Sequence, residues 1–252
     1  MKRINFLGCP MDVASMEGTV RVIEEAVREG QFTQHVVVNV AKLVNMRKDT
    51  ALHESIVGCD IINIDGMGVV LGARLLGHQV PERVAGVDLF HELLAMSARC
   101  GYSVFLLGAT GEVVEKTADT VQQRYPGLKL AGYHHGYFWD NEQLVVDKIH
   151  DSGAQLLFVA ITSPKKENFI NRWREKLGVT FVMGVGGTFD VVAGKVKRAP
   201  IWMQKWGLEW LYRVIQEPRR MWKRYLVTNA KFAGMLLVEK FRQRTGVKRV
   251  RT

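Results

Sequence analysis

Short apolar runs alternate with amphipathic stretches over the first two thirds of the chain. The apolar runs are rich in β-branched residues and are bounded by Gly, Asn or Ser, and the expected strands are His35–Val40, Asp60–Asp65, Ser103–Leu107, Gln155–Ile161 and Thr180–Val185. Apolar positions recur at helical spacing between them, and the expected helices are Gly18–Glu29, Thr50–Val57, Met67–Leu76, Val87–Cys100, Glu112–Tyr125, Asn141–Ser152 and Pro164–Lys176. This alternation predicts an α/β fold: a Rossmann-like, mainly parallel sheet sandwiched by helices.

The pattern changes after Pro200, where long helical stretches follow without strand signals. Pro218 is expected to divide them into two helices, because proline interrupts helical hydrogen bonding. We therefore predict an α/β domain over residues 1–200 and a helical appendage over residues 201–252. Four of the six tryptophans fall in the appendage, interleaved with Lys and Arg: Trp202, Trp206, Trp210 and Trp222.

The appendage is strongly basic. The whole chain has a formal net charge of +10, and residues 195–252 hold 16 Lys and Arg against three acids, which leaves −3 for residues 1–194. Such asymmetry predicts an anionic partner: phospholipid, nucleic acid or a phosphorylated substrate. Aromatic and apolar residues beside cations favour a helix at a membrane interface, and the alternative is a packed helix with a solvated charged face. No run reaches the roughly 18 apolar residues of a spanning helix, so we expect peripheral attachment.

The cysteines Cys9, Cys59 and Cys100 are widely spaced and contain no C-x-x-C pair. We expect reduced, buried thiols in a cytoplasmic protein. Metal binding is not expected either, because the seven histidines show no H-x-x-x-H spacing and no D-x-D triplet occurs. A transferase without D-x-D would need Arg, Lys or backbone donors to offset a departing diphosphate.

Glycine-rich loops follow two of the predicted strands. One runs from Gly184 to Asp190 and the other starts at Gly108, and each precedes a predicted helix, where free backbone N–H groups and the helix dipole favour a phosphate. A tight turn without a ligand is the alternative. Neither loop has the G-x-G-x-x-G spacing, so a dinucleotide-dependent oxidoreductase is disfavoured.

A carboxylate, Asp65, ends the second predicted strand, at the sheet edge where open parallel sheets bind ligands. It can serve as a general base, or it can cap the helix predicted from Met67. Arg83, Asp88 and Arg198 are further charged residues beside Pro or Gly, for which a solvated surface is the alternative.

Several separate motifs occur in an order typical of one enzyme family. They are Asn39 on an early strand, Asp65-Gly66, Arg83 to Asp88, Ser163-Pro164-Lys165-Lys166-Glu167, Gly184 to Asp190, Lys197 to Pro200 and Gly207 to Arg213. In these motifs, which span roughly residues 35–225, the chain resembles the WecG/TagA/CpsF family, glycosyltransferase family 26.

The resemblance implies an inverting, metal-independent transfer from a UDP-sugar to a sugar on a polyprenyl-diphosphate carrier. The expected donors are UDP-linked N-acetylmannosamine, its uronic acid or glucose. The expected setting is the inner face of the cell membrane, in exopolysaccharide, other cell-surface polysaccharide or teichoic acid synthesis, with no cofactor. Asp65 is the implied base, and Arg83 and Asn39 complete the implied catalytic set.

The remaining site residues follow from the same motifs. Donor binding is expected from Gly108, Gly184, Gly186, Gly187, Thr188, Asp190, Lys166 and Glu167, and the diphosphate is expected to meet Arg198, Arg213, Arg220 and Arg224. The sequence departs from the family at Lys166, where glutamine is usual.

Two expectations concern partners. If the basic appendage docks on the membrane only when it is free, the protein is expected to exchange between a monomer and a homo-oligomer. Nucleic-acid binding is the alternative function, but it requires a basic face on the body, and residues 1–194 sum to −3. We therefore expect no nucleic-acid partner.

Overall fold

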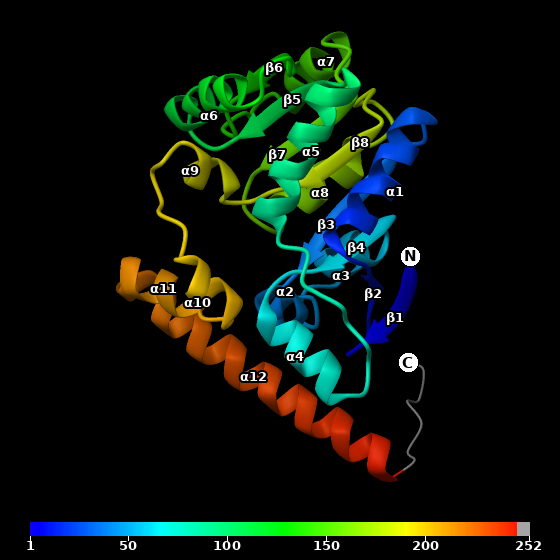
Figure 1. The fold of residues 1–252 in the computed structure, drawn as a ribbon, viewed down its shortest axis with the longest axis vertical. Helices are drawn as coiled ribbons and strands as arrows, with labels where there is room; N and C mark the ends of the chain where they lie inside the picture. The colour runs from blue at the N-terminus through cyan, green and yellow to red at the C-terminus, as the bar shows by residue number, and fades with distance from the viewer. Residues whose placement is uncertain (246–252) are drawn as a thin grey trace.

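A computed structural model describes residues 1–245, with the exception of the Arg220 side chain (Figure 1). An eight-stranded sheet has the order β1-β2-β4-β3-β8-β7-β5-β6, and the pairs from β2 to β6 are all parallel. The strands are β1 Lys2–Phe6, β2 Cys9–Val13, β3 Thr33–Val38, β4 Ile61–Ile64, β5 Ser103–Gly108, β6 Lys129–His134, β7 Leu156–Ala160 and β8 Phe181–Gly184. The predicted α/β class and mainly parallel sheet are confirmed.

The helices are α1 Met16–Arg28, α2 Val40–Asn45, α3 Thr50–Val57, α4 Met67–Leu75, α5 Gly86–Cys100, α6 Gly111–Arg124, α7 Glu142–Asp151, α8 Lys165–Trp173, α9 Thr188–Val192, α10 Ile201–Lys205, α11 Glu209–Gln216 and α12 Pro218–Thr245. Pro218 does separate two helices, α11 and α12. Helix α2 was not expected, and the prediction that Asn39 lies on a strand is wrong. Asn39 follows β3 and caps α2, because its side-chain oxygen accepts the Lys42 N–H at 3.1 Å.

Three strands, β1, β2 and β6, lacked a strand signal in the sequence, and β1 and β6 are the two edges of the sheet. β1 pairs antiparallel with β2, which contains a proline, Pro10, opposite Asn5. β6 lies at the other edge of the sheet and carries Gly132. Proline and glycine weaken strand patterns. Gly132 lies on an edge strand, and Pro10 lies near the start of β2, before Asp12, at which β2 pairs with β4.

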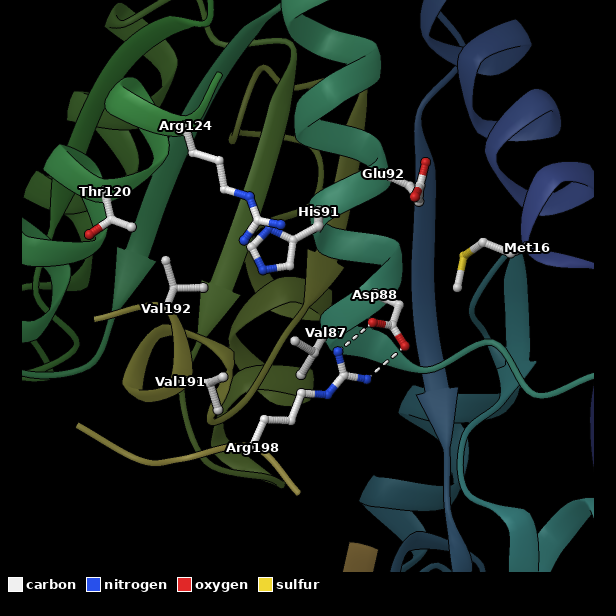
Figure 2. A pocket seen from close by; sticks show the side chains of 10 residues that line it. All are labelled: Met16, Val87, Asp88, His91, Glu92, Thr120, Arg124, Val191, Val192 and Arg198. Carbon is white, nitrogen blue, oxygen red and sulfur yellow. Dashed lines mark hydrogen bonds and ion pairs between the residues drawn. The ribbon is translucent and has the colours of Figure 1, made fainter. Parts of the chain in front are cut away.

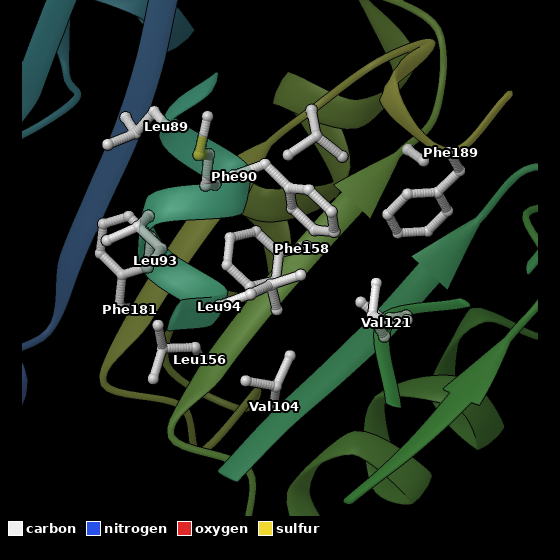
Figure 3. Close-up of a cluster of buried hydrophobic side chains, with 14 of the residues drawn as sticks. Leu89, Phe90, Leu93, Leu94, Val104, Val121, Leu156, Phe158, Phe181 and Phe189 are labelled. Carbon is white, nitrogen blue, oxygen red and sulfur yellow. The ribbon is translucent and has the colours of Figure 1, made fainter. Parts of the chain in front are cut away.

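Helices cover both faces of the sheet. On one face α5 and α6 pack over β5, β7 and β8, and the Phe90 ring meets Phe158 edge-on at 4.8 Å between centroids (Figure 3). On the other face α2, α3 and α4 cover β2, β3 and β4, while α7 and α8 cover β5 and β7. Both layers leave the carboxyl ends of the parallel strands free of the core.

Helix α12 packs along the body beside α2 and α4 (Figure 1). Phe232 is buried in the same apolar cluster as Phe6, and a Cβ added to Gly72 of α4 would lie 2.8 Å from the Phe232 ring. At the far end, Lys240 donates to the Leu75 carbonyl at 2.8 Å, which satisfies a terminal carbonyl of α4. The appendage therefore completes part of the core.

Replacing Gly72 by valine is expected to loosen α12. The added methyl groups would displace Phe232, and overpacking of this kind costs about 1–3 kcal/mol. Urea unfolding should show that loss, and hydrogen exchange should increase in residues 228–245. Gly234→Ala is the matched control on α12, where an added Cβ meets nothing within 4 Å. Unchanged exchange in Gly72→Val would contradict this packing.

Candidate active site

Asp65 directly follows β4, which lies between β2 and β3 in the sheet, and β8 is the next strand beyond β3. The Asp65 N–H donates to the Val38 carbonyl at 2.9 Å, and the Val84 N–H donates to the Ile64 carbonyl at 2.9 Å, so three chain segments meet at this point. The N-cap of α4 is Gly66, and no side chain caps that helix. The alternative reading of Asp65 as a helix cap is therefore wrong, and its carboxylate is not used by the helix.

The environment of Asp65 favours a carboxyl that holds its proton more tightly than usual. Burial raises the pKa of Asp65, and Glu209 raises it further, while Arg83, Arg213 and Lys42 oppose the shift. These charged groups come from α2, the loop before α5 and α11. A carboxylate with a raised pKa beside cations at a sheet edge suits general-base work.

An ion-pair chain links the loop before α5 to the appendage. Arg83 Nη1 lies 2.5 Å from a Glu209 carboxylate oxygen, and Arg198 Nε lies 3.7 Å from the other. Arg198 also holds Asp88 through two hydrogen bonds of 2.5 and 2.7 Å, drawn in Figure 2. The bond to Arg198 lowers the pKa of Asp88 against the opposing effect of its burial. Glu209 lies within the Gly207 to Arg213 motif, but sequence reasoning gave it no role.

The helices of the appendage are held over Asp65. Gly207, with φ of +72°, joins α10 to α11, and a Cβ there would lie 2.6 Å from the Cβ of Met67 at the start of α4. Only glycine allows this close approach.

Two of the predicted arginines of the appendage, Arg213 and Arg224, lie near Tyr225 of α12. Tyr225 is half-buried, and burial is the main cause of its raised pKa. The cations Arg213 and Arg224 lower the pKa of Tyr225, whereas the carboxylates Glu209 and Asp65 raise it further. Arg213 and Arg224 are exposed, whereas the Arg220 side chain lies outside the described residues. Tyr225, like Glu209, was not foreseen.

A buried charge cluster lies below this surface. Glu167 is 2% exposed and forms ion pairs with Lys42, at 3.2 Å, and with Lys166. The Lys42 ammonium group also donates a hydrogen bond to the Val37 carbonyl at 2.9 Å. Despite its burial, the two lysines lower the pKa of Glu167 to about 2, and burial lowers the pKa of Lys166 to about 8. The predicted donor-binding residues Lys166 and Glu167 thus lie inside the protein. Lys42 was missed because helix α2 was not predicted and the expected strand was extended to Val40, the first residue of that helix.

The glycine-rich loops follow β8 and β5 as predicted. Gly184 packs against the Lys166 side chain, and Gly186 and Gly187 are at least partly exposed. Thr188 is 2% exposed, and its hydroxyl donates to the Val185 carbonyl at 2.8 Å, so its side chain lies under the loop.

The last two predicted donor residues differ in accessibility. Asp190, on α9, is partly exposed. Gly108 is buried, with φ of +127°, and its Cα lies close to Gly136. The backbone at the end of β5 is therefore packed directly against the segment that follows β6. Strands two apart in a sheet are separated by about 10 Å, which places the loop after β8 within reach of Asp65 for a ligand of nucleotide size.

A cavity of about 450 Å³ opens on the α5, α6 and α9 side, shown in Figure 2. Arg198 borders it, and Arg124 and His91 line its wall. Burial lowers the pKa of His91 to about 4, so the ring is neutral near pH 7. Of the predicted site residues, Arg198 alone lines this cavity, which therefore differs from the expected donor site at the loop after β8.

Three other expectations can be compared with the structure. Cys9 and Cys59 are buried free thiols, whereas Cys100 is exposed, so its predicted burial is wrong. Within residues 1–245, no three His, Cys, Asp or Glu side chains are grouped as metal ligands would be. Among the helices described, none has the length and apolar character needed to cross a bilayer.

Comparison with known proteins identifies the family of this chain. The model of the family described as "Glycosyl transferase WecG/TagA/CpsF family" matches residues 4–246. An N-acetylglucosaminyldiphosphoundecaprenol N-acetyl-beta-D-mannosaminyltransferase of Bacillus subtilis is 37% identical over 79% of this chain and 76% of its own length. A protein of the same name from Bacillus spizizenii is 40% identical over 66% of this chain and 64% of its own length. The chain belongs to the WecG/TagA/CpsF family of glycosyltransferases.

Proposed function

We propose that this glycosyltransferase moves N-acetylmannosamine from UDP to an N-acetylglucosamine unit on a polyprenyl diphosphate. The names of the two Bacillus relatives support the sugar and the acceptor. The uronic acid of N-acetylmannosamine and glucose are the other donors that the family resemblance suggests. The observation that carries the chemistry is the Asp65 carboxylate at a strand end, facing Arg83 and the helices of the appendage.

In this proposal Asp65 takes the proton of the acceptor hydroxyl while its oxygen attacks the anomeric carbon. UDP departs on the opposite side, so one displacement inverts the configuration without a glycosyl-enzyme intermediate. Asn39 and Arg83 lie at the ends of the neighbouring segments, where they would orient the reacting groups. The Gly186-Gly187 loop would meet the nucleotide, and Asp190 on α9 would meet its ribose or uracil.

Charge growing on the diphosphate would be offset by arginines instead of a divalent cation. Arg198, Arg213 and Arg224 are the candidates among the described side chains, and such preorganised donors act strongly in a site closed to water. Part of the closure would come from the turn between α10 and α11, where Gly207 already packs over Met67 at the start of α4.

The direct test is a panel of UDP-sugars incubated with a lipid-diphosphate-linked N-acetylglucosamine, with UDP release, product mass and the NMR-determined anomeric configuration of the product as readouts. We expect UDP-N-acetylmannosamine to give a disaccharide product, and EDTA to leave the rate unchanged. Product from another UDP-sugar alone would overturn the donor, a rate abolished by EDTA would overturn the metal-independent step, and a retained anomeric configuration would overturn inversion.

We further propose that the appendage attaches the protein to the cytoplasmic face of the membrane. Trp206 is 78% exposed, and the large apolar side chains exposed on α10 to α12 include Ile201, Trp202, Ile215, Trp222 and Leu226. Exposed cations accompany them: Lys205, Arg219 and Lys223. Tryptophan favours the membrane interface, and each basic residue contributes about 1 kcal/mol near an anionic leaflet.

Replacing Trp202 and Trp206 together by serine should lower binding to phosphatidylglycerol vesicles about tenfold or more, because both side chains are exposed. Vesicle co-sedimentation measures the loss. Substitution is preferable to truncation, since Phe232 belongs to the core. Tyr137→Ser is the control, because Tyr137 is exposed on the loop after β6. Equal sedimentation of the double variant and the wild type would refute attachment through this surface.

A further inference from the structure

Helix α11 is held by polar contacts at both of its ends and by the Trp210 ring, whose centroid lies 5.9 Å from that of Tyr225 on α12. None of its eight residues is buried. Its first residue, Glu209, reaches both Arg83 and Arg198, and its last, Gln216, donates to the Lys197 carbonyl at 3.0 Å. A short helix without buried side chains depends on such contacts for its position, and the Glu209 side chain is 28% exposed, which leaves it free to be displaced by a ligand.

The two arginines that meet Glu209 have their charges fully offset in this structure. Arg83 and Arg198 contribute two positive charges, and Glu209 and Asp88 contribute two negative ones, so this ion-pair chain is neutral. An entering diphosphate would therefore meet cations already occupied by carboxylates. At Arg198, Asp88 is bound by two hydrogen bonds and Glu209 lies at 3.7 Å, so at this arginine Glu209 is the carboxylate that an anion can replace more readily. At Arg83 the anion would have to replace a Glu209 hydrogen bond of 2.5 Å.

We propose that Glu209 occupies the diphosphate subsite of the empty enzyme and closes α11 over it until the donor displaces the carboxylate. When the donor binds, Arg83 and Arg198 exchange the Glu209 carboxylate for phosphate oxygens as their hydrogen-bond acceptors. The inference rests on the proposed function for the identity of the donor, while the subsite itself is defined by the two arginines. Glu209 acts here as an internal competitor for the anion, and not as a group that orients the arginines for it.

The competitor role predicts that removing the charge of Glu209 strengthens anion binding. In Glu209→Gln, calorimetric titration should give about tenfold tighter binding of UDP and of inorganic pyrophosphate, while uridine, which lacks phosphate, should bind as it does to the wild type. Glu115→Gln is the matched control, an exposed glutamate on α6, and should leave all three affinities unchanged. Thermal unfolding within about 3 °C of the wild type would show that the variant folds.

Hydrogen exchange on the wild-type protein gives a test without a variant. Adding UDP or pyrophosphate should speed exchange in residues 209–216, because α11 loses its anchor when the anion takes the arginines. Equal or slower exchange would overturn the proposal, as would UDP and pyrophosphate binding to Glu209→Gln that is equal to or weaker than in the wild type. Wild-type protein that binds no UDP would overturn the donor assignment instead, and the pyrophosphate titrations would still test Glu209.

Discussion

Replacing Asp65 by asparagine should lower turnover by about two to four orders of magnitude while UDP binds with nearly wild-type affinity. Asparagine keeps the size of the side chain but cannot accept the proton of the acceptor hydroxyl, and a positioned base contributes about 10²–10⁴ to rate. Steady-state UDP release and calorimetric UDP binding measure the two effects. Asp119→Asn, at an exposed position on α6, is the matched control.

The pH dependence should separate a base from a merely structural carboxylate. Because burial and Glu209 raise the pKa of Asp65 against the effects of Arg83, Arg213 and Lys42, wild-type activity should rise with pH through a value above that of an ordinary aspartate. The residual activity of Asp65→Asn should lack this limb. Turnover by the variant equal to the wild type would remove Asp65 from the reaction.

The same shift predicts a gain in stability for the inactive variant. A carboxyl whose folded pKa is raised stabilises the fold at low pH, and that contribution is lost as the pH rises through the folded value. Near pH 7 the wild type therefore keeps a charge in an unfavourable place, and Asp65→Asn should unfold at higher urea concentration. Greater stability with lost turnover is expected where a residue is retained for chemistry.

Replacing Glu167 by glutamine should destabilise the fold by about 3–5 kcal/mol, since it leaves Lys42 and Lys166 facing each other without a carboxylate. Lys166→Gln, which restores the glutamine usual in the family, should be far milder, because the Lys42–Glu167 pair remains neutral. Urea unfolding compares the two. Glu175→Gln, at an exposed position after α8, serves as the control.

Lowering the pH should also reduce the stability of the wild type through protonation of Glu167. The pKa of Glu167 is lowered from 4.5 to about 2, so its contribution is present above pH 4.5 and is lost as the pH falls towards 2. In Glu167→Gln that part of the acid-induced loss should be missing. A cost below about 1 kcal/mol for Glu167→Gln would show that water or backbone groups, and not Glu167, offset the two lysines.

The buried lysines also show why local pattern was insufficient. Lys42 follows a strand that the pattern extends to Val40, and only the cap made by Asn39 reveals that a helix has begun. Lys166 and Glu167 were expected to face the donor, but they lie beneath the surface because Gly184 leaves room for the Lys166 side chain. Within this cluster, Lys42 lowers the pKa of Asp65.

The sequence by itself determined the α/β class, the strand ends that carry Asp65 and the glycine-rich loops, the break at Pro218 and the family. These features depend on hydrophobic period, on turn residues and on motifs, which are local properties of the chain. Only the tertiary structure decided that α12 joins the core through Phe232 and that Glu209 meets Arg83, a residue 126 positions away. Contacts between residues so distant leave no periodic trace, because their free energy depends on burial and charge that exist only once the chain has folded.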